Sequence, residues 1–296
     1  MKDISKEDLE KYRNYLTEDK DCAVCGGKSD RLWARCGSFK AVQCSLCGFI
    51  WINPSLSQEG LEKYYADYIG MRFKDEEKTK QRKIQYGIDK DFIEAFITKG
   101  KVLDVGCSGG FFLDVLGPDF KKHGIEVDPA AVEYARRSYP FGRDIKHCRL
   151  ENAPFPSESF DLIIMRGVIE HLPDLHSALS KAESLLKPGG YYYIAATPNA
   201  GSFCAGIYRE KWNLFHPIRH LSYFDLNTTR KMMLKYGLKF LDKEFPYLET
   251  PYADLLKDHL EMLDAFLARK KGSFRKIGRS RAFWGNIMNL IFRKEN

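Results

Sequence analysis

The sequence lacks the features that mark a membrane-spanning or secreted chain. None of its apolar runs reaches the length of about 18 residues that a bilayer-crossing helix needs, and charged residues recur throughout positions 1–20, where a signal peptide would be apolar. No internal repeat or low-complexity tract is visible. The 296 residues are 44% hydrophobic and 14% aromatic, which is enough for a packed core and argues against disorder. We expect a folded cytoplasmic protein of one or two domains.

The chain also has no large net charge of either sign. The formal net charge of +7 is compatible with phosphorylated small molecules, nucleic acid or an anionic membrane surface, so it excludes none of them. Residues 269–281, here called the basic stretch, contain seven basic residues and no acidic one. A solvated face or loop is the simplest interpretation. The alternatives are contacts with the phosphates of a nucleotide sugar, with a lipid-linked acceptor at a membrane surface, or with RNA.

The cysteines do not indicate a disulfide scaffold, because half of them are scattered along the chain and the other half form two close pairs. Four of the eight cysteines form two Cys-x-x-Cys pairs separated by an 18-residue gap: Cys22, Cys25, Cys44 and Cys47. Gly26 and Gly48 follow the pairs and allow tight turns whose backbone N–H groups point at the thiolates. Four thiolates at this spacing predict a closed, tetrahedral structural Zn²⁺ site in a reducing compartment, with iron or unliganded core thiols as alternatives.

The rest of the chain divides into segments by composition. Residues 1–54 form a leader and the zinc-ribbon module, 55–98 a helical connector, 99–250 an α/β domain, and 251–296 a helical basic extension whose end we expect to be an antiparallel strand. Alternating strand and helix patterns predict a Rossmann-like, mostly parallel sheet. We predict strands at 101–105, 123–127, 144–148, 160–165, 191–197 and 238–245, and helices after Gly110, after Pro129, over 174–186, ending before Pro188-Gly189-Gly190, and over 226–236.

Residues 102–110 (VLDVGCSGG) carry the strongest chemical signal. An apolar strand runs into glycines that allow close backbone approach to a ligand, followed by a helix N-terminus whose N–H groups face that ligand. Asp104 lies where a dinucleotide places its pyrophosphate, which a carboxylate would repel. S-adenosylmethionine (SAM) brings an ammonium and a sulfonium instead, and its carboxylate can use the helix N-terminus. Glu126 ends the next predicted strand, 20 residues after Gly106, where a carboxylate accepts hydrogen bonds from ribose hydroxyls.

The sequence resembles the class I SAM-dependent methyltransferases. Residues 151–174 (ENAPFPSESFDLIIMRGVIEHLPD) and 185–199 (LLKPGGYYYIAATPN) are similar to that family's motifs. The resemblance implies a seven-stranded, mostly parallel sheet of the class I fold. It also implies a cofactor site formed by Asp104, Gly106, Cys107, Gly110, Glu126, Val127, Leu150 and Glu151. Ser108 and Arg149 depart from the usual pattern, which has a glycine and a small acidic or polar residue at these positions.

The zinc module followed by residues 49–70 resembles the N-terminal module of methyltransferases that act on sugars and other small metabolites. The resemblance implies that this module forms part of the acceptor cleft, and we expect Tyr64, Tyr65 and Tyr68 either to line it or to pack the amphipathic connector.

Two histidines are candidates for the base that an acceptor of high pKa requires: His171 and His220. The stretch from His220 to Phe224 is similar to a motif of sugar C-methyltransferases in which the histidine is a base, and the resemblance implies that Arg219 and Tyr223 lie near the substrate. Arg219 replaces the motif's glutamate and Pro217 its tyrosine. A structural histidine is the alternative at both positions.

We therefore expect a methyltransferase whose acceptor is a small metabolite, such as a sugar or a nucleotide sugar, in polysaccharide or natural-product assembly. An RNA methyltransferase that uses the zinc module for recognition is a rival, although the module has no dense basic stripe. A non-catalytic SAM-binding partner protein is another.

Overall fold

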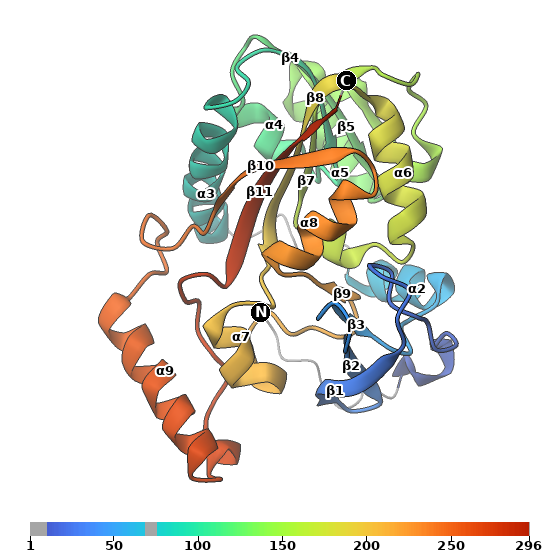
Figure 1. Ribbon diagram of the computed structural model, residues 1–296. Coiled ribbons are helices and arrows are strands. Elements are labelled where there is room, and N and C mark those ends of the chain that lie inside the picture. The colour runs from blue at the N-terminus through green and yellow to red at the C-terminus, as the bar shows by residue number, and fades with distance from the viewer. Residues whose placement is uncertain (1–10, 69–75, 296) are drawn as a thin grey trace. The chain divides into compact units, whose positions relative to one another are not determined.

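The computed structural model describes residues 11–68 and 76–295, and within them all side chains except those of residues 29–30, 66–68 and 76–80. Two compact units share the chain (Figure 1). Unit 1 comprises Met1–Tyr68, Pro198–Thr229 and Phe245–Met288, and unit 2 comprises Ile69–Thr197, Arg230–Glu244 and Asn289–Asn296. Each unit is thus assembled from stretches far apart in sequence.

Unit 2 is built on a seven-stranded sheet with the order β10-β11-β8-β7-β4-β5-β6. The pairs β4–β5, β4–β7, β5–β6 and β7–β8 are parallel, and β10–β11 is antiparallel. The strands are β4 (Gly100–Val105), β5 (Phe120–Glu126), β6 (Ile145–His147), β7 (Phe160–Arg166), β8 (Leu186–Pro198), β10 (Leu238–Glu244) and β11 (Ile287–Lys294). The predicted mostly parallel, Rossmann-like sheet is therefore confirmed, with β4 and its following loop near its middle.

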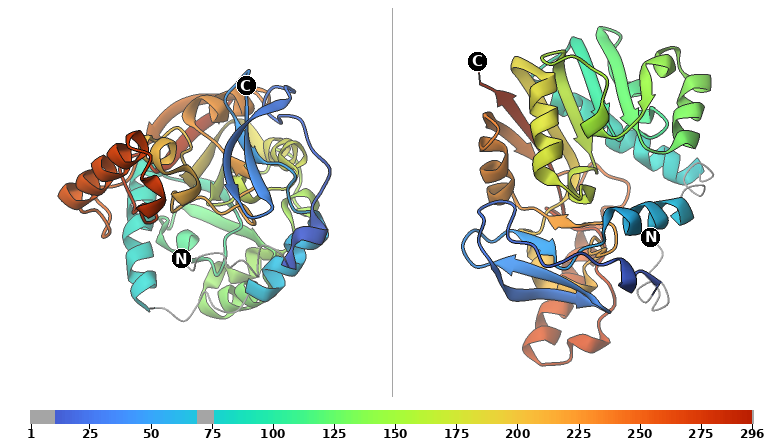
Figure 2. Two further views of the ribbon diagram at one scale, coloured as in Figure 1. Left: turned by 90° about the horizontal axis from the view of Figure 1, so that it is seen from below. Right: turned by 90° about the vertical axis from the view of Figure 1, so that its right-hand side faces the viewer.

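Helices cover both faces of this sheet. They are α3 (Glu76–Glu94), α4 (Phe111–Val115), α5 (Pro129–Ser138), α6 (Leu175–Leu185) and α8 (Leu226–Leu234), with 3₁₀ turns η2 (Pro140–Asp144), η3 (Leu150–Asn152) and η4 (Ile169–His171). Figures 1 and 2 show α3 and α6 on opposite faces. Ile93, Phe112 and Val132 of α3, α4 and α5 share one buried cluster with strand residues such as Ile164. The alternation of side chains along β7 sends Ile163 to the other face.

Unit 1 contains a second, smaller antiparallel sheet with the order β1-β2-β3-β9. Its strands are β1 (Ser29–Cys36), β2 (Phe39–Cys44), β3 (Ile50–Ile52) and β9 (Ser222–Tyr223). The unit also holds α2 (Gln58–Tyr68), α7 (Phe203–Tyr208), α9 (Leu255–Lys270), and the 3₁₀ turns η1 (Arg13–Tyr15), η5 (Arg209–Lys211) and η6 (Phe274–Lys276). We call residues 19–54 the cysteine ribbon.

Most predicted elements are confirmed, including the final antiparallel strand, and the largest difference lies at the boundary between α6 and β8. Helix α6 ends at Leu185, and β8 begins at Leu186, five residues earlier than expected. Pro188 and Gly189 lie inside the strand instead of in a separating turn. The register between β7 and β8 is irregular at this point, which shows how the sheet accommodates them. Within the described ranges, no helix combines the length and the apolar character needed to cross a bilayer.

Candidate cofactor and metal sites

The loop after β4, residues 106–110, is held in a shape that requires glycine. Gly106 has φ +71°, and a Cβ there would lie 2.8 Å from a methyl carbon of Val168. Gly110 has φ +81° and directly precedes α4. The backbone N–H groups of Gly106 and Cys107 both donate to the carbonyl of Ile125, at 2.8 and 3.1 Å, which ties the loop to β5. We call residues 106–110 the glycine loop.

Glu126 is fixed at the carboxyl end of β5 by the backbone around it. One carboxylate oxygen accepts a hydrogen bond from the N–H of Ser108 at 2.8 Å. The other accepts from the N–H groups of Val127 and Asp128 at 2.7 and 2.9 Å. The side chain therefore bridges the glycine loop and the end of β5. Carboxylates of this kind can also accept hydrogen bonds from the hydroxyls of a ribose.

Asp104, in the middle of the sheet, is an unusual carboxyl group. The residue is only 2% exposed. Burial raises its pKa to about 8; the positive charge of Arg166 opposes the rise, and the carboxylate of Glu126 adds to it. No hydrogen bond from the described residues offsets the burial. A cationic ligand group beside this carboxyl would favour its ionised form, so the residue fits the ammonium or sulfonium of SAM.

A buried ion pair in unit 2 was not predicted from the sequence. Arg166 at the end of β7 donates from Nε to Oδ2 of Asp89 on α3 at 2.5 Å. Tyr193 and Asn289 donate to the other carboxylate oxygen at 3.3 and 2.7 Å. Burial alone would lower the pKa of Arg166, but Asp89 raises it, so the arginine keeps its charge. The only sign of this ion pair in the sequence is that Arg166 directly follows the apolar run of the predicted strand 160–165.

The remaining predicted cofactor residues all lie in unit 2. Cys107 is buried in the glycine loop, and burial raises the pKa of its thiol. Val127 follows Glu126 and is exposed. Leu150 and Glu151 lie in η3, where Leu150 is buried and Glu151 is exposed. Their contact with a cofactor remains a prediction.

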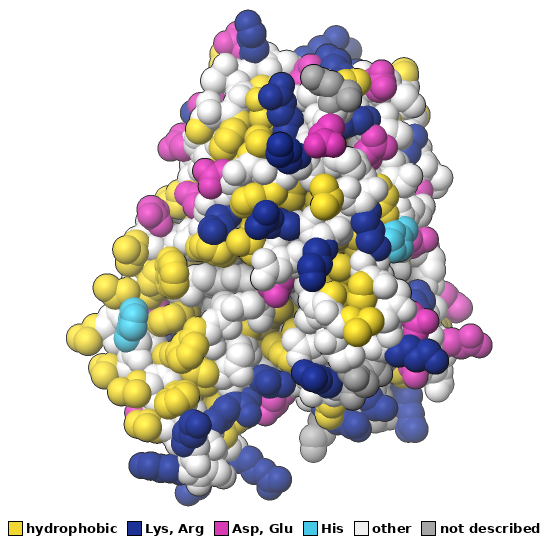
Figure 3. All heavy atoms as spheres, viewed as in Figure 1, with side chains coloured by type: hydrophobic (Ala, Val, Ile, Leu, Met, Phe, Trp, Pro, Cys, Tyr) yellow, Lys and Arg dark blue, Asp and Glu magenta, His cyan; other side chains and the backbone are white. Residues whose placement is uncertain are grey.

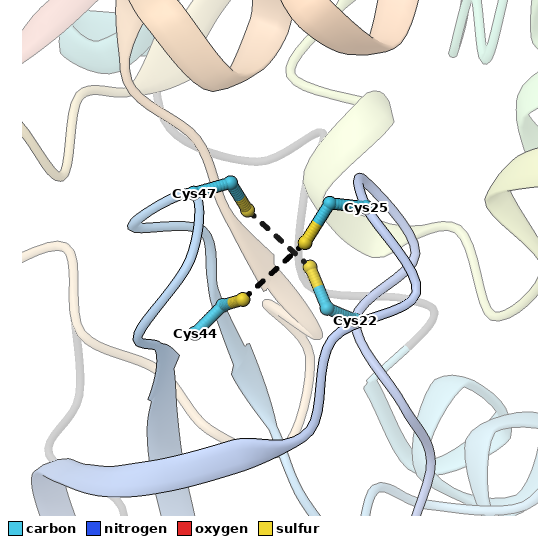
Figure 4. A group of neighbouring side chains, drawn as sticks. All are labelled: Cys22, Cys25, Cys44 and Cys47. Atoms are coloured by element: carbon cyan, nitrogen blue, oxygen red, sulfur yellow. Dashed lines mark hydrogen bonds between the residues drawn. The ribbon is translucent and has the colours of Figure 1, made fainter.

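The four predicted metal ligands converge in the cysteine ribbon (Figure 4). Their sulfur atoms all lie within 4.8 Å of one another. Cys22 and Cys47 approach to 3.5 Å between sulfurs, and Cys25 and Cys44 to 3.4 Å. The edge of a tetrahedron with Zn–S bonds of 2.3 Å is about 3.8 Å long. The four thiols therefore fit a tetrahedral metal ion with little adjustment.

The two Cys-x-x-Cys turns have matching backbones. Gly26 and Gly48 have φ +74° and +83°, and their N–H groups donate to the carbonyls of Cys22 and Cys44. Although burial raises the pKa of the Cys44 thiol, hydrogen bonds from the backbone of Cys47 and of the residue before it lower the pKa to about 7. N–H groups directed at sulfur in this way stabilise metal-bound thiolates.

His220 lies in unit 1, two residues before β9. Strand β9 pairs with β3, so this part of the chain completes the sheet of the cysteine ribbon. His220 is 5% exposed, and its Nδ1 lies 2.9 Å from the carbonyl oxygen of Leu214. This bond favours the tautomer with the proton on Nδ1, which puts the lone pair on Nε2. Arg219 is half-buried, while the ring of Tyr223 is buried against Trp33.

His171 belongs to unit 2, where it ends η4. Its Nε2 lies 3.9 Å from Oε1 of the buried Glu170, and its side chain is 21% exposed. The two candidate bases are thus carried by different compact units. Tyr64 and Tyr65 pack partly buried against the core of unit 1. Tyr68 is the last residue of α2, and its side chain lies outside the described residues.

Three arginines of the basic stretch have internal roles. Arg269 donates to backbone carbonyls of α7. Arg279 donates to the carbonyls of Trp212, Asn213 and Phe215. Arg281 forms an ion pair with Glu261 at 3.0 Å. The basic stretch is therefore not only a solvated surface, because the side chains of these three arginines hold unit 1 together.

Comparison with known proteins agrees with this geometry. A family model described as a methyltransferase domain matches residues 77–243, which is more than half of the chain. An S-adenosylmethionine-dependent methyltransferase of Mycolicibacterium smegmatis is 35% identical over 106 residues, covering 36% of this chain and 40% of that protein. A ubiquinone biosynthesis O-methyltransferase of Bartonella bacilliformis is 31% identical over 154 residues, covering 49% and 57%. The aklanonic acid methyltransferase of a Streptomyces species is 32% identical over 117 residues, covering 36% and 53%.

Solved structures show the same fold. A SAM-dependent methyltransferase of Thermotoga maritima superimposes with a TM-score of 0.51 at 19% identity, covering 79% of this chain and 98% of that one. A Bacillus halodurans protein gives a TM-score of 0.51 at 18% identity, covering 74% and 100%. Fold and site together define the class I, SAM-dependent methyltransferase architecture. The chain belongs to the methyltransferase domain family. It spans between 40% and 57% of the length of the curated relatives described above.

Proposed function

We propose that this protein transfers a methyl group from SAM to a small metabolite, with sugars and nucleotide sugars as the preferred acceptor class. The observation that carries the proposal is Asp104, a buried carboxyl beside the glycine loop in a chain of the methyltransferase domain family. A cationic cofactor satisfies this carboxyl, whereas a pyrophosphate would be repelled by it. The preference for sugars rests on the similarity of the ribbon and of residues 220–224 to sugar methyltransferases.

The residues of unit 2 divide the cofactor between them in this proposal. Asp104 and the glycine loop hold the methionine portion, Glu126 the ribose, and Leu150 with Glu151 the adenine. SAM supplies a methyl group made electrophilic by the sulfonium. The chain's own contribution is to hold donor and acceptor in line, which can account for much of the rate of such a displacement.

The cysteine ribbon holds a structural Zn²⁺ in this proposal. Four thiolates occupy all four positions of a tetrahedral ion, so no position is left for an acceptor or for water. The ion would act on the acceptor only through the fold of unit 1, which carries His220.

His220 is the preferred base. A proton on Nδ1, held by the carbonyl of Leu214, leaves Nε2 to receive a proton from an acceptor hydroxyl or carbon acid. His171 is the second candidate. The relatives named for ubiquinone biosynthesis and for aklanonic acid extend the acceptor class to other small natural products, for which a base is also useful when the acceptor proton has a high pKa.

Transfer of radiolabelled methyl from SAM to a panel of sugars, nucleotide sugars and phenolic acceptors tests the proposal. With the acceptor found, His220→Ala should keep SAM affinity within about twofold and lose at least about 100-fold in kcat, in the range of general-base catalysis. His176→Ala, an exposed histidine on α6, is the matched control and should keep both.

Three results would overturn parts of this proposal. Unchanged turnover in His220→Ala would remove the base assignment alone. Methylation of RNA, or tight RNA binding at physiological salt, would favour the RNA methyltransferase. Calorimetry without any SAM binding would leave only a partner protein without catalysis.

A further inference from the structure

Helix α9 exposes an apolar face that the core of unit 1 does not use. One side of the helix is buried through Met262, Ala265 and Ala268. A different side carries exposed apolar side chains, of which Leu256 is 73% exposed. They are Leu255, Leu256, Leu260, Leu263, Phe266 and Leu267, here called the α9 face. At 100° per residue they cover an arc of about 140°. An exposed apolar stripe this wide marks an interaction site for a protein partner or a membrane.

The α9 face borders a groove within unit 1. The groove has a volume of about 650 Å³ and is lined by apolar side chains of α9 and of the segments beside it, among them Phe203, Tyr247, Leu248, Phe283 and Trp284. Trp284 is 59% exposed. Figure 3 shows hydrophobic side chains gathered over α9 at the lower left of the molecule. Face and groove form one continuous apolar surface.

Positive charge marks one end of this surface. Figure 3 shows Lys and Arg side chains at the lower end of the apolar area. Four basic residues at or just after the C-terminal end of α9 are exposed: Lys270, Lys271, Arg275 and Lys276. Among the described residues, no carboxylate forms an ion pair with any of them. Their positive charge is therefore available to an external anion.

The acidic residues of α9 do not cancel this charge. Asp258 is buried and accepts a hydrogen bond from Tyr247, and Glu261 is paired with Arg281. Asp264 is exposed, and at 100° per residue it lies about 40° beyond Leu260, the last residue of the apolar arc. The α9 face and the four basic residues are thus adjacent, and the exposed carboxylate of Asp264 lies outside both.

We propose that the α9 face and the four basic residues dock this protein on an anionic lipid bilayer. Leucine and aromatic side chains would enter the boundary between headgroups and acyl chains, while the lysines and arginines contact the lipid phosphates. Charge complementarity favours this occupant, because four exposed basic side chains beside an exposed apolar face match the phosphates and the acyl boundary of an anionic bilayer. The inference is independent of the methyl acceptor.

Flotation with vesicles tests the inference on the full chain. We expect at least tenfold more protein bound to vesicles of equal parts phosphatidylglycerol and phosphatidylcholine than to pure phosphatidylcholine, and loss of most binding in 1 M salt. Trp33, Trp51 and Trp212 are buried, so Trp284 should dominate any change in fluorescence. Its emission should shift to the blue on binding, and Trp284→Phe should abolish the shift.

Two pairs of variants separate the contributions. Leu256→Glu with Leu263→Glu removes the apolar contact, and Lys271→Glu with Lys276→Glu removes the charge; each should reduce binding to anionic vesicles at least tenfold. Leu234→Glu on α8 is the control for an exposed leucine, and Lys235→Glu with Lys239→Glu is the control for charge. The controls should bind like the wild type, and circular dichroism should show that all variants are folded.

Either of two outcomes overturns the inference. The first is equal, negligible binding of wild-type protein to both kinds of vesicle. The second is a stable dimer that Leu256→Glu with Leu263→Glu converts to a monomer while vesicle binding is absent, because the α9 face would then be an interface between copies.

Discussion

The cysteine ribbon and the glycine loop use similar backbone chemistry for opposite purposes. Each depends on glycines with positive φ, Gly26 and Gly48 in the ribbon and Gly106 and Gly110 in the loop. In the ribbon the glycines shape the turns that bring four thiols together, and an ion bound by all four would join the two turns, so that its binding would be coupled to folding. In the loop the surrounding sheet is large, and it holds a buried carboxyl, Asp104, that is unfavourable without a cation. A ligand should therefore be required for folding at the ribbon and only for function at the loop.

Removing two of the candidate metal ligands of the ribbon should have the largest effect. Cys22→Ser with Cys25→Ser should lower bound metal from about one ion per chain to none, because apparent binding energies of structural zinc are about 10–16 kcal/mol and couple to folding. Limited proteolysis should then cut within residues 19–54. Elemental analysis and mass spectrometry of the fragments measure both effects. Cys148→Ser in unit 2 is the control and should keep the metal. A metal-free double variant that resists proteolysis would show that the ribbon folds without a metal ion, contrary to the comparison.

Removing the charge of Asp104 should act in the opposite sense on stability. The unfolded carboxyl ionises near 3.8 and the folded one near 8. The folded state is therefore increasingly disfavoured as the pH rises between these values, and the full penalty is present above pH 8. Asp104→Asn should raise the Tm of the ligand-free protein at pH 8 by about 2–4 °C.

The same variant should weaken SAM binding at least about 100-fold, because the amide cannot offer a negative charge to the cation. Calorimetry and thermal melts measure the two quantities, with Asp119→Asn, an exposed aspartate before β5, as the control. Weaker SAM binding together with a lower Tm would show that Asp104 is needed for the fold, contrary to the comparison.

Proton release gives a smaller but sharper signal. At pH 6.5 Asp104 should be mostly protonated in the ligand-free protein, and a bound cation should ionise it. SAM binding should then release up to about one proton, and its affinity should increase as the pH approaches 8. Calorimetry in buffers of different ionisation enthalpy measures the number of protons. Equal heats in all buffers, or unchanged release in Asp104→Asn, would mean that this carboxyl is not the group that meets the cation.

The smallest predicted effect concerns backbone shape alone. Gly106→Ala should destabilise unit 2 by about 1–3 kcal/mol, since the residue has φ +71° and its Cβ would lie 2.8 Å from Val168. Gly87→Ala in α3 is the matched control, because a Cβ there meets nothing within 4 Å. That change should stabilise the helix by up to about 1 kcal/mol. Denaturant unfolding measures both, and equal effects of the two changes would show that the loop does not require glycine.

The sequence was informative where local pattern determines structure. The strand that contains Asp104, the glycine loop and the strand that ends at Glu126 were predicted at or near their observed positions, because apolar runs and glycines act over a few residues. The convergence of the four cysteines was equally predictable, because the spacing of the two pairs indicates it. These local signals predicted most of the sheet and brought together the main residues of both candidate sites.

Long-range contacts were not predictable in the same way. Nothing in the composition of residues 222–223 indicates that they pair with β3, because the partner lies about 170 positions earlier. The ion pair between Arg166 and Asp89 joins a strand to a helix 77 residues away. Pro188 was interpreted as a breaker, but the sheet accepts it through an irregular register. In all three cases the tertiary structure decides, and local propensity does not.

The short strand β9 has a consequence for protein engineering. Because β3 pairs with residues 222–223, the sheet of the ribbon is not complete within residues 19–54. If residues 19–54 alone were transplanted onto another methyltransferase, the edge of β3 would be unpaired. Trp33 would also lose its contact with the buried ring of Tyr223. A chimera would need to contain both stretches, and a truncation that starts after the ribbon would uncover apolar side chains that pack against it, such as Trp212 and Tyr223.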